Sequence, residues 1–314
     1  MKKVIYIETN RWERKINMLN LKVDNLNYNY GKVQALKDIS FQVNEGLIGV
    51  LGANGAGKTT LMKLLTTLFS TQSGEIYLDE LNYKKDLNVI RKNIGYLPQN
   101  FSTYENIKGR EFLEVIANLK LDCHKKTIEN HINEIVKELN MEEYIDRKFK
   151  EYSGGMKQKL GFAQVLIGDP RLIIVDEPTV GLDPEQRNVI RELFPIISRN
   201  RIVLATTHIV EDIEYYCNYL LVINNGELIY KGTKENFIKE VDGLLWEADV
   251  NAETLISIKE KNLILTTVYN EENCHIKYVS NIPLTENSVN IKVNLQDAYI
   301  IHNKTHVHSK YKED

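Results

Sequence analysis

The sequence predicts an α/β fold in which a parallel sheet carries helices on its faces. Three short apolar runs, residues 47–51, 172–175 and 202–206, have the continuous hydrophobicity of strands that are buried on both faces. Other stretches, such as residues 59–69, space their apolar residues as a helix does. Strands that alternate with helices along a chain are typical of a parallel sheet covered by helices.

Period-two patterns predict additional, antiparallel strands. Residues 19–23 and 39–43 alternate apolar and polar side chains, so each strand is expected to bury one face. Residues 220–223 and 227–230 flank Asn225-Gly226, a pair that favours a type I′ turn and therefore a hairpin.

The interval from residue 104 to residue 152 is expected to be helical and follows two short predicted strands, residues 76–78 and 94–97. The apolar residues of its two predicted helices are Phe112, Val115, Ile116 and Leu119, then Ile132, Ile135, Val136 and Leu139.

Length and composition restrict the function classes. The 314 residues suggest about two domains, and no apolar run approaches the ~20 residues that cross a bilayer. A net charge of −3 argues against a dedicated nucleic-acid-binding protein. Cys123, Cys217 and Cys274 lie far apart without metal-ligand spacing, which fits inert thiols in a reducing compartment.

Both ends of the chain differ from its centre. Residues 1–17 do not extend the pattern that starts at Met18, so we expect either a flexible extension or translation from Met18. Residues 238–314 alternate as strands at 246–250, 263–269 and 274–279, with a helix at 252–259, and predict a small α+β appendage. The polar end, residues 306–314, is expected to be disordered.

A glycine-rich loop between a buried strand and a helix carries the first chemical motif, residues 52–60. Gly55 and Gly57 allow successive backbone N–H groups to face an anion, and the following helix adds its positive end. Lys58 can reach β- and γ-phosphates, and Thr59 offers a hydroxyl to Mg²⁺. The loop therefore predicts a nucleotide-phosphate site.

A pair of carboxylates ends the second buried strand. Asp176 and Glu177 are expected at the carboxyl edge of the sheet, where open α/β folds bind ligands. Two adjacent buried carboxylates repel one another, so the pair is most easily explained beside a cation. Asp176 is predicted to hold Mg²⁺, and Glu177 to orient or deprotonate an attacking water.

A third motif, Ser153-Gly154-Gly155, precedes a predicted helix with the core face Met156, Leu160, Ala163 and Ile167. Ser153 can cap this helix, and the two glycines leave backbone N–H groups accessible to an anion. Taken alone, the motif is equally compatible with an ordinary capped helix.

The order of these motifs resembles the nucleotide-binding domain of ATP-binding-cassette (ABC) transporters over residues 18–237. The resemblance implies a P-loop NTPase core with an antiparallel β subdomain, an inserted helical subdomain at about residues 100–152 and the C-terminal accessory domain, residues 238–314. The residues that match the family's nucleotide-binding motifs are Tyr30, Gly52, Asn54, Gly55, Ala56, Gly57, Lys58, Thr59, Thr60, Ser153, Gly154, Gly155 and Asp183.

The resemblance also assigns roles. Glu177, His208 and Gln99 are the implied catalytic residues, and Thr59, Gln99 and Asp176 the implied Mg²⁺ ligands. ATP and Mg²⁺ are the implied cofactors, with the adenine stacked on an aromatic ring. Tyr28 is expected on the same side of the strand as Tyr30, and only the family's Tyr-Gly pattern favours Tyr30.

Two positions depart from the family pattern. The signature motif begins with Tyr152 where leucine is usual, a variant similar to the subgroup paired with ABC-2-type permeases of drug and peptide-antibiotic exporters. The D-loop reads Val180-Gly181-Leu182-Asp183 and does not begin Ser-Ala, which leaves its backbone contacts open.

The function implied is an ATP-hydrolysing subunit that powers translocation, in the export direction, through a separate membrane permease. Its implied partners are an integral-membrane permease and a second ATP-binding subunit in a homodimer, with no nucleic acid. Its implied place is the cytoplasmic face of the cell membrane, as a peripheral protein. Two alternatives remain: a soluble ABC-type ATPase that remodels ribosomes or DNA, and a nucleotide-binding regulator without turnover.

Overall fold

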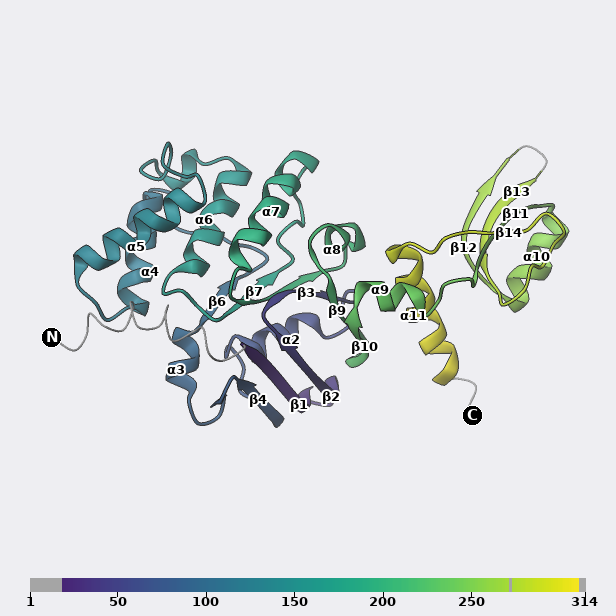
Figure 1. Cartoon of the computed structure of the whole chain (residues 1–314), viewed down its shortest axis with the longest axis horizontal. Coiled ribbons are helices and arrows are strands. Elements are labelled where there is room, and N and C mark those ends of the chain that lie inside the picture. The colour runs from purple at the N-terminus through teal and green to yellow at the C-terminus, as the bar shows by residue number, and fades with distance from the viewer. Residues whose placement is uncertain (1–18, 271–272, 311–314) are drawn as a thin grey trace. The chain divides into compact units, whose positions relative to one another are not determined.

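The computed structural model describes residues 19–270 and 273–310 (Figure 1). The predicted N-terminal extension, residues 1–17, lies outside the described residues. The chain divides after Lys231 into two compact units. Within the two described stretches, no helix combines the length and the apolar character that crossing a membrane demands.

The first unit contains two sheets and the helices that cover them. Its strands are β1 (Asn20–Tyr30), β2 (Val33–Asn44), β3 (Gly46–Leu51), β4 (Ser73–Leu78), β5 (Leu81–Asn82), β6 (Ile94–Leu97), β7 (Leu172–Asp176), β8 (Ile202–Thr207), β9 (Tyr219–Asn224) and β10 (Glu227–Thr233), which continues past Lys231. Its helices are α2 (Lys58–Leu65), α3 (Leu87–Lys92), α4 (Gly109–Lys120), α5 (Lys125–Glu138), α6 (Gly154–Leu166), α7 (Pro184–Ile197) and α8 (Val210–Tyr216), with a 3₁₀ turn at Phe149–Glu151.

The larger sheet has the order β10-β9-β3-β8-β7-β6. Strands β9, β3, β8, β7 and β6 pair in parallel, as the three buried apolar runs predicted. Asn225 and Gly226 connect β9 to β10 with φ angles of 49° and 81°, the positive values that a type I′ turn requires. The predicted α/β class and the predicted hairpin are therefore confirmed.

Alternate residues of β7 enter two different hydrophobic cores. Ile173 and Val175 pack into the core formed with α6 and α7, whereas Leu172 and Ile174 pack into the core shared with α2 and the antiparallel strands. Figure 1 shows α6 and α7 on one side of this sheet and β1 and β2 on the other. Burial on both faces explains why the sequence of β7 is continuously apolar.

The smaller sheet of this unit has the order β2-β1-β4-β5. β1 pairs with β2 antiparallel, with Leu21 opposite Val43 and Val23 opposite Phe41. These four side chains are buried while their neighbours along each strand are more exposed, so the period-two pattern is confirmed.

The helical region follows β6. On α5 the predicted face is buried, with Ile132, Ile135 and Val136 all in the core. On α4 the prediction was partly wrong, because Val115 and Leu119 are exposed while Leu113 and Ala117 fill the core. The buried face of α4 is therefore offset around the helix axis, by about one residue position, from the face that is most apolar in sequence.

The second unit is an α+β fold, as expected. Its strands β11 (Leu245–Val250), β12 (Leu263–Tyr269), β13 (Cys274–Val279) and β14 (Val289–Asn290) form an antiparallel sheet in the order β12-β13-β11-β14. Its helices are α9 (Lys234–Lys239), α10 (Ala252–Lys261) and α11 (Leu295–Lys310).

Helices α9 and α11 hold together through an aromatic pair. The ring of Phe237 stacks on His302 at 4.2 Å, and Nε2 of His302 lies 3.0 Å from the carbonyl oxygen of Phe237. Residues 232–237 therefore belong to the second unit, whereas residue 237 was the expected end of the first domain. The expected disorder of residues 306–314 is corrected for residues 306–310, because α11 continues to Lys310, and residues 311–314 lie outside the described residues. Asn294 caps this helix by accepting from the N–H of Asp297, and elongation of a formed helix is inexpensive.

Candidate active site

The glycine loop connects β3 to α2 in a conformation that leaves the helix N-terminus uncapped. Gly55 and Gly57 have φ angles of 80° and 111°, values that favour glycine. A Cβ at Gly57 would also lie 2.8 Å from the carbonyl oxygen of Ala35. Gly57 is the N-cap of α2 without a side-chain cap, and no acidic residue occupies the first turn. This end of α2 is therefore suited to an anion.

The side chain of Lys58 reaches back over the part of the glycine loop that precedes it. Its Nζ donates to the carbonyl oxygens of Gly52 at 2.7 Å and Ala53 at 3.2 Å, and lies 3.7 Å from Oε1 of Glu177. Burial lowers the pKa of Lys58, and the carboxylates of Glu177 and Asp176 oppose that change. The ammonium group is thus fixed between the loop and the carboxylates.

Gly52 and Ala56 support the loop and do not line the pocket described below. A Cβ at Gly52 would lie 2.5 Å from the carbonyl oxygen of Ile223 in β9. The carbonyl oxygen of Ala56 accepts from the N–H of Gly226 at 2.9 Å. These two positions therefore hold the loop against the β9–β10 hairpin.

Asp176 is buried at the end of β7, where burial raises its pKa and a hydrogen bond from Thr206 opposes the rise. The Thr206 hydroxyl donates to Oδ1 of Asp176 at 2.6 Å and accepts from the N–H of Glu177 at 3.0 Å. Thr206 was not among the predicted site residues. The sequence feature that could have indicated Thr206 is a polar residue near the end of β8, the strand that pairs with β7.

Glu177 is the point at which three predicted residues meet. Its Oε2 accepts from Nε2 of Gln99 at 3.2 Å and lies 3.3 Å from Nδ1 of His208, while its Oε1 faces Lys58. Gln99 follows β6 and His208 follows β8, so the cluster forms at the carboxyl edge of the parallel sheet. Glu177 has a φ of 47°, a left-handed backbone that its neighbours must hold in place.

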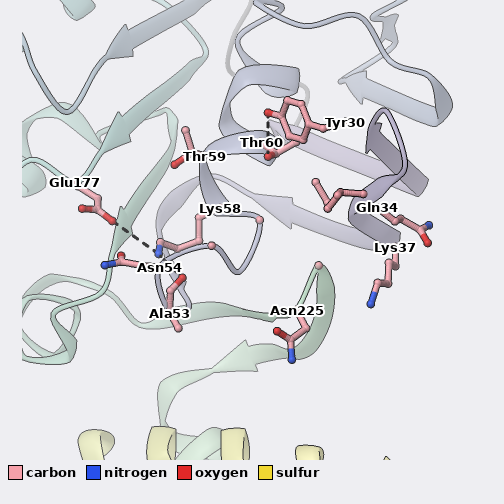
Figure 2. Close-up of a pocket in the computed structure, with 15 residues that line it drawn as sticks. Tyr30, Gln34, Lys37, Ala53, Asn54, Lys58, Thr59, Thr60, Glu177 and Asn225 are labelled. Carbon is pink, nitrogen blue, oxygen red and sulfur yellow. Dashed lines mark hydrogen bonds and ion pairs between the residues drawn. The ribbon is translucent and has the colours of Figure 1, made fainter.

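A pocket of about 670 Å³ opens beside this cluster (Figure 2). It is lined by Tyr30, Val33, Gln34, Ala35, Lys37, Ala53, Asn54, Gly55, Gly57, Lys58, Thr59, Thr60, Glu177, Asn225 and Gly226. The predicted members come from β1, the glycine loop and the end of β7. Residues 33–35, Lys37 and the hairpin turn were not predicted as site residues, because neither segment carries a nucleotide-binding motif. The two segments meet where the N–H of Lys37 donates to Gly226 at 2.7 Å.

Tyr30 rather than Tyr28 faces the pocket. Tyr30 is 46% exposed, and its hydroxyl lies 3.3 Å from the hydroxyl of Thr60. Tyr28 instead stacks on Phe69 at 5.4 Å and does not line the pocket. The open ring face of Tyr30 is therefore the one available to a planar base.

Ser153, Gly154, Gly155 and Asp183 lie outside the pocket of their own chain. Ser153 caps α6 by accepting from the N–H of Met156, and Asp183 caps α7 by accepting from the N–H of Gln186 at 2.8 Å. A Cβ at Gly154 would meet the Gln186 side chain at 2.9 Å, so the two helix starts are neighbours. A Cβ at Gly155 would meet no atom within 4 Å.

The residues predicted to hold Mg²⁺ offer oxygen atoms, which that ion prefers. Asp176 supplies a carboxylate and Thr59 a hydroxyl. Gln99 donates to Glu177 through its amide nitrogen, which leaves its carbonyl oxygen for a ligand. Within residues 19–270 and 273–310, no group of three or more histidine, cysteine or acidic side chains is arranged to hold a metal ion by itself.

Comparison with known proteins identifies the family. The profile of the family described as "ABC transporter" matches residues 36–180. The ABC transporter ATP-binding protein YxlF of Bacillus subtilis (strain 168) is 36% identical over 242 residues, which cover 77% of each chain. The chain belongs to the ABC transporter ATP-binding family. Members of this family are ATPases, and the chain is accordingly an ABC-type ATPase subunit.

Two further similarities bear on this ABC ATPase. The Nod factor export ATP-binding protein I of Rhizobium etli is 32% identical over 216 residues, 68% of each chain. The structure of cbiO1 from Clostridium perfringens, described as part of the ABC transporter complex cbiONQ, aligns with a TM-score of 0.64 and 25% identity. That alignment covers 78% of this chain and 96% of cbiO1, which confirms the P-loop NTPase fold.

Proposed function

We propose that this ATPase hydrolyses Mg·ATP between two copies of the chain and thereby drives export through a separate integral-membrane permease. The observation that carries the proposal is the contact of Glu177 with Lys58, Gln99 and His208 at one edge of the sheet. These are the groups that phosphoryl transfer to water needs: a base, a cation for the phosphates and residues that position both.

Each residue of the site has a role in the proposal. Tyr30 stacks on the adenine, the glycine loop and Lys58 hold the phosphates, and His208 contacts the γ-phosphate. Glu177 orients the attacking water and accepts its proton. Thr59, Asp176 and Gln99 would hold Mg²⁺, which would supply positive charge to neutralise the phosphates.

A head-to-tail homodimer accounts for the residues outside the pocket. Ser153 and Gly155 lie at the start of α6, where the space beside Gly155 is open and a helix N-terminus can bind an anion. In a second copy, the same helix start would face the γ-phosphate held by the first copy, and Asp183 would lie beside it. Hydrolysis removes the shared anion, so the closed state loses the contacts that favoured it.

Coupling to a permease is supported by the position of Gln99. This residue contacts Glu177 and stands at the entry to the helical region, so one side chain connects the site to that region. The similarity to the Nod factor export protein supports the export direction. The protein would act as a peripheral subunit at the cytoplasmic face of the cell membrane.

The decisive experiment uses Glu177→Gln in the full chain. We expect phosphate release to fall at least about a hundredfold because the base is lost, while ATP binding persists and an ATP-dependent dimer accumulates in size-exclusion chromatography. Glu143→Gln, an exposed position on the helical region, is the matched control and should hydrolyse ATP normally. Normal turnover in Glu177→Gln would remove Glu177 from its role.

A second experiment addresses the partner. Membrane co-sedimentation that depends on a co-expressed permease supports the transport role. Co-sedimentation with ribosomes in the absence of membranes would contradict it.

A further inference from the structure

A buried carboxylate on α8 connects three segments around the site. Asp212 is 0% exposed, and both of its oxygens have partners. Its Oδ2 accepts from the hydroxyl of Thr179 at 2.5 Å, and its Oδ1 accepts from Nη2 of Arg191 at 2.8 Å. Thr179 is itself fully buried, so its hydrogen bond to Asp212 is a buried, charge-assisted one.

The three members come from segments that each follow a site residue. Thr179 is two residues beyond Glu177, and Asp212 is four residues beyond His208. Arg191 lies on α7, the helix that Asp183 caps. One carboxylate therefore joins the chain after the proposed base, the helix after His208 and the helix that starts at Asp183.

The geometry of Arg191 fixes the network from its far side. Its guanidinium lies over the ring of Tyr215, with 4.0 Å between the guanidinium carbon and the ring centroid. Arg191 also contacts Oδ1 of Asn188, one turn earlier on α7, at 3.4 Å. A guanidinium held by a ring and two acceptors has few alternative positions, so Asp212 is confined as well.

Glu177 needs such support on both sides. Its left-handed φ of 47° is uncommon for a residue with a side chain and must be imposed by neighbours. On the N-terminal side, its N–H is held by Thr206. On the C-terminal side, the first side chain to reach a buried partner is that of Thr179.

We infer that Asp212 is a positioning residue that, through Thr179, keeps the carboxylate of Glu177 within reach of His208 and of the reacting water. This inference rests on the proposed function of Glu177 as the base. Asp212 does not touch substrate, and its effect reaches the reaction only through the segments that carry Glu177 and His208. Misplacing a catalytic group by about 1 Å lowers rates by about a hundredfold, so a small displacement suffices.

The test removes one hydroxyl without changing side-chain volume. In Thr179→Val, we expect kcat to fall about tenfold to about a hundredfold, with less than about a twofold change in the KM for ATP because the phosphate loop is intact. Thr179→Ser restores the hydroxyl and should recover most of the rate. Asp212→Asn, which removes the charge that Arg191 meets, should resemble Thr179→Val.

A second arginine–aspartate ion pair, at the opposite edge of the sheet and more exposed, supplies the control. Asp169 and Arg201 pair at 2.8 Å where β7 and β8 begin. Asp169→Asn loses a similar charge pair, and the φ of 50° at this position suits asparagine. We expect Asp169→Asn to keep the wild-type kcat, whatever the change in its thermal stability.

A double-mutant cycle separates positioning from general damage. If Thr179 acts through Glu177, Thr179→Val should cause no further loss in single-turnover hydrolysis by the Glu177→Gln variant. Equal losses in both backgrounds, or a wild-type kcat in Thr179→Val, would overturn the inference. If Glu177→Gln is inactive while Thr179→Val and Asp212→Asn keep the wild-type kcat, only the inference about Asp212 fails. If Glu177→Gln turns over normally, the proposed function of Glu177 fails first.

Discussion

Thr206 and Asp176 face each other across β8 and β7, and the Thr206 hydroxyl donates a hydrogen bond of 2.6 Å to Oδ1 of Asp176. The same hydroxyl oxygen accepts from the N–H of Glu177. A single threonine on the neighbouring strand therefore fixes the side chain of one carboxylate and the backbone of the next. Both carboxylates depend on a residue that carries no charge.

Thr206→Val should shift the pH dependence of hydrolysis. Burial already raises the pKa of Asp176, and the Thr206 hydroxyl lowers it. Removing the hydroxyl raises this pKa further, so Asp176 becomes protonated at a higher pH. The acid limb of the kcat/KM profile should move to higher pH, and Thr206→Ser should keep the wild-type limb. A hydrogen bond to a charged group contributes roughly 1.5–3 kcal/mol, so kcat/KM should also fall about tenfold or more. An unmoved acid limb in the valine variant would contradict this assignment.

Tyr30→Ala should weaken nucleotide binding without unfolding the protein. Stacking of a base on an aromatic ring is worth about 1–3 kcal/mol, and Tyr30 presents a half-exposed ring to the pocket. Titration with a fluorescent ATP analogue should show a Kd increase of about fivefold or more, while Tyr30→Trp retains affinity. Tyr28→Ala is the matched control, because Tyr28 packs on Phe69 and should affect thermal stability more than affinity. Equal affinity losses in the two alanine variants would argue against base stacking on Tyr30.

Lys120 should make the stability of the protein rise with pH in the alkaline range. Its Nζ donates to the carbonyl oxygen of Ile94 at 2.9 Å, and burial lowers its pKa from 10.5 to about 8. Between these values the unfolded chain binds more protons than the folded one, so the free energy of unfolding increases as pH rises from about 8 toward 10.5. The full effect is roughly 3 kcal/mol.

Urea unfolding at pH 7.5 and at pH 9.5 measures this contribution. Lys120→Met should lose the increase that wild-type protein gains between the two conditions. The exposed Lys137→Met should retain it. An identical pH response in wild-type protein and Lys120→Met would show that Lys120 titrates normally.

Much of the fold follows from local sequence patterns, whereas the partners across strands and turns do not. The continuous apolar run of β7 and the Asn225-Gly226 turn each predict their structure because a few neighbouring residues determine it. Val115 and Leu119 misled the prediction because the buried face of α4 is chosen by the helices that pack on it. In the same way, Thr206 and Asp212 acquire their roles only from strands and helices that meet in space.

The candidate site likewise contains residues that a local sequence motif predicts and residues that only the fold brings together. The glycine loop, Glu177, Gln99 and His208 could be predicted because each belongs to a short motif, and the structure places the last three together. Lys37 in β2 and Asn225 in the β9–β10 turn line the pocket from segments that are distant in sequence. No pattern within either segment indicates that the other lies beside it.

Two complementary lesions test the head-to-tail dimer directly. Lys58→Ala removes the phosphate contact of its own pocket. Gly155→Glu places a carboxylate at the start of α6, where a Cβ meets no atom within 4 Å, so the fold tolerates it while a phosphate is repelled. Each variant alone should be inactive. In a head-to-tail heterodimer, one site carries both lesions and the other carries neither.

An equal mixture of Lys58→Ala and Gly155→Glu subunits should therefore regain hydrolysis. With random pairing in a two-fold dimer, half of the dimers are mixed and each has one intact site, so about a quarter of wild-type phosphate release should return. Gly155→Ala, which adds a methyl group without charge, should stay active alone. This result would show that added side-chain volume does not cause the inactivity of Gly155→Glu. Recovery requires that Lys58 of one copy and Gly155 of the other bind the same ATP. If each site were built within one chain, every site in the mixture would still carry one of the two substitutions. A mixture as inactive as its components would mean that each chain completes its own site.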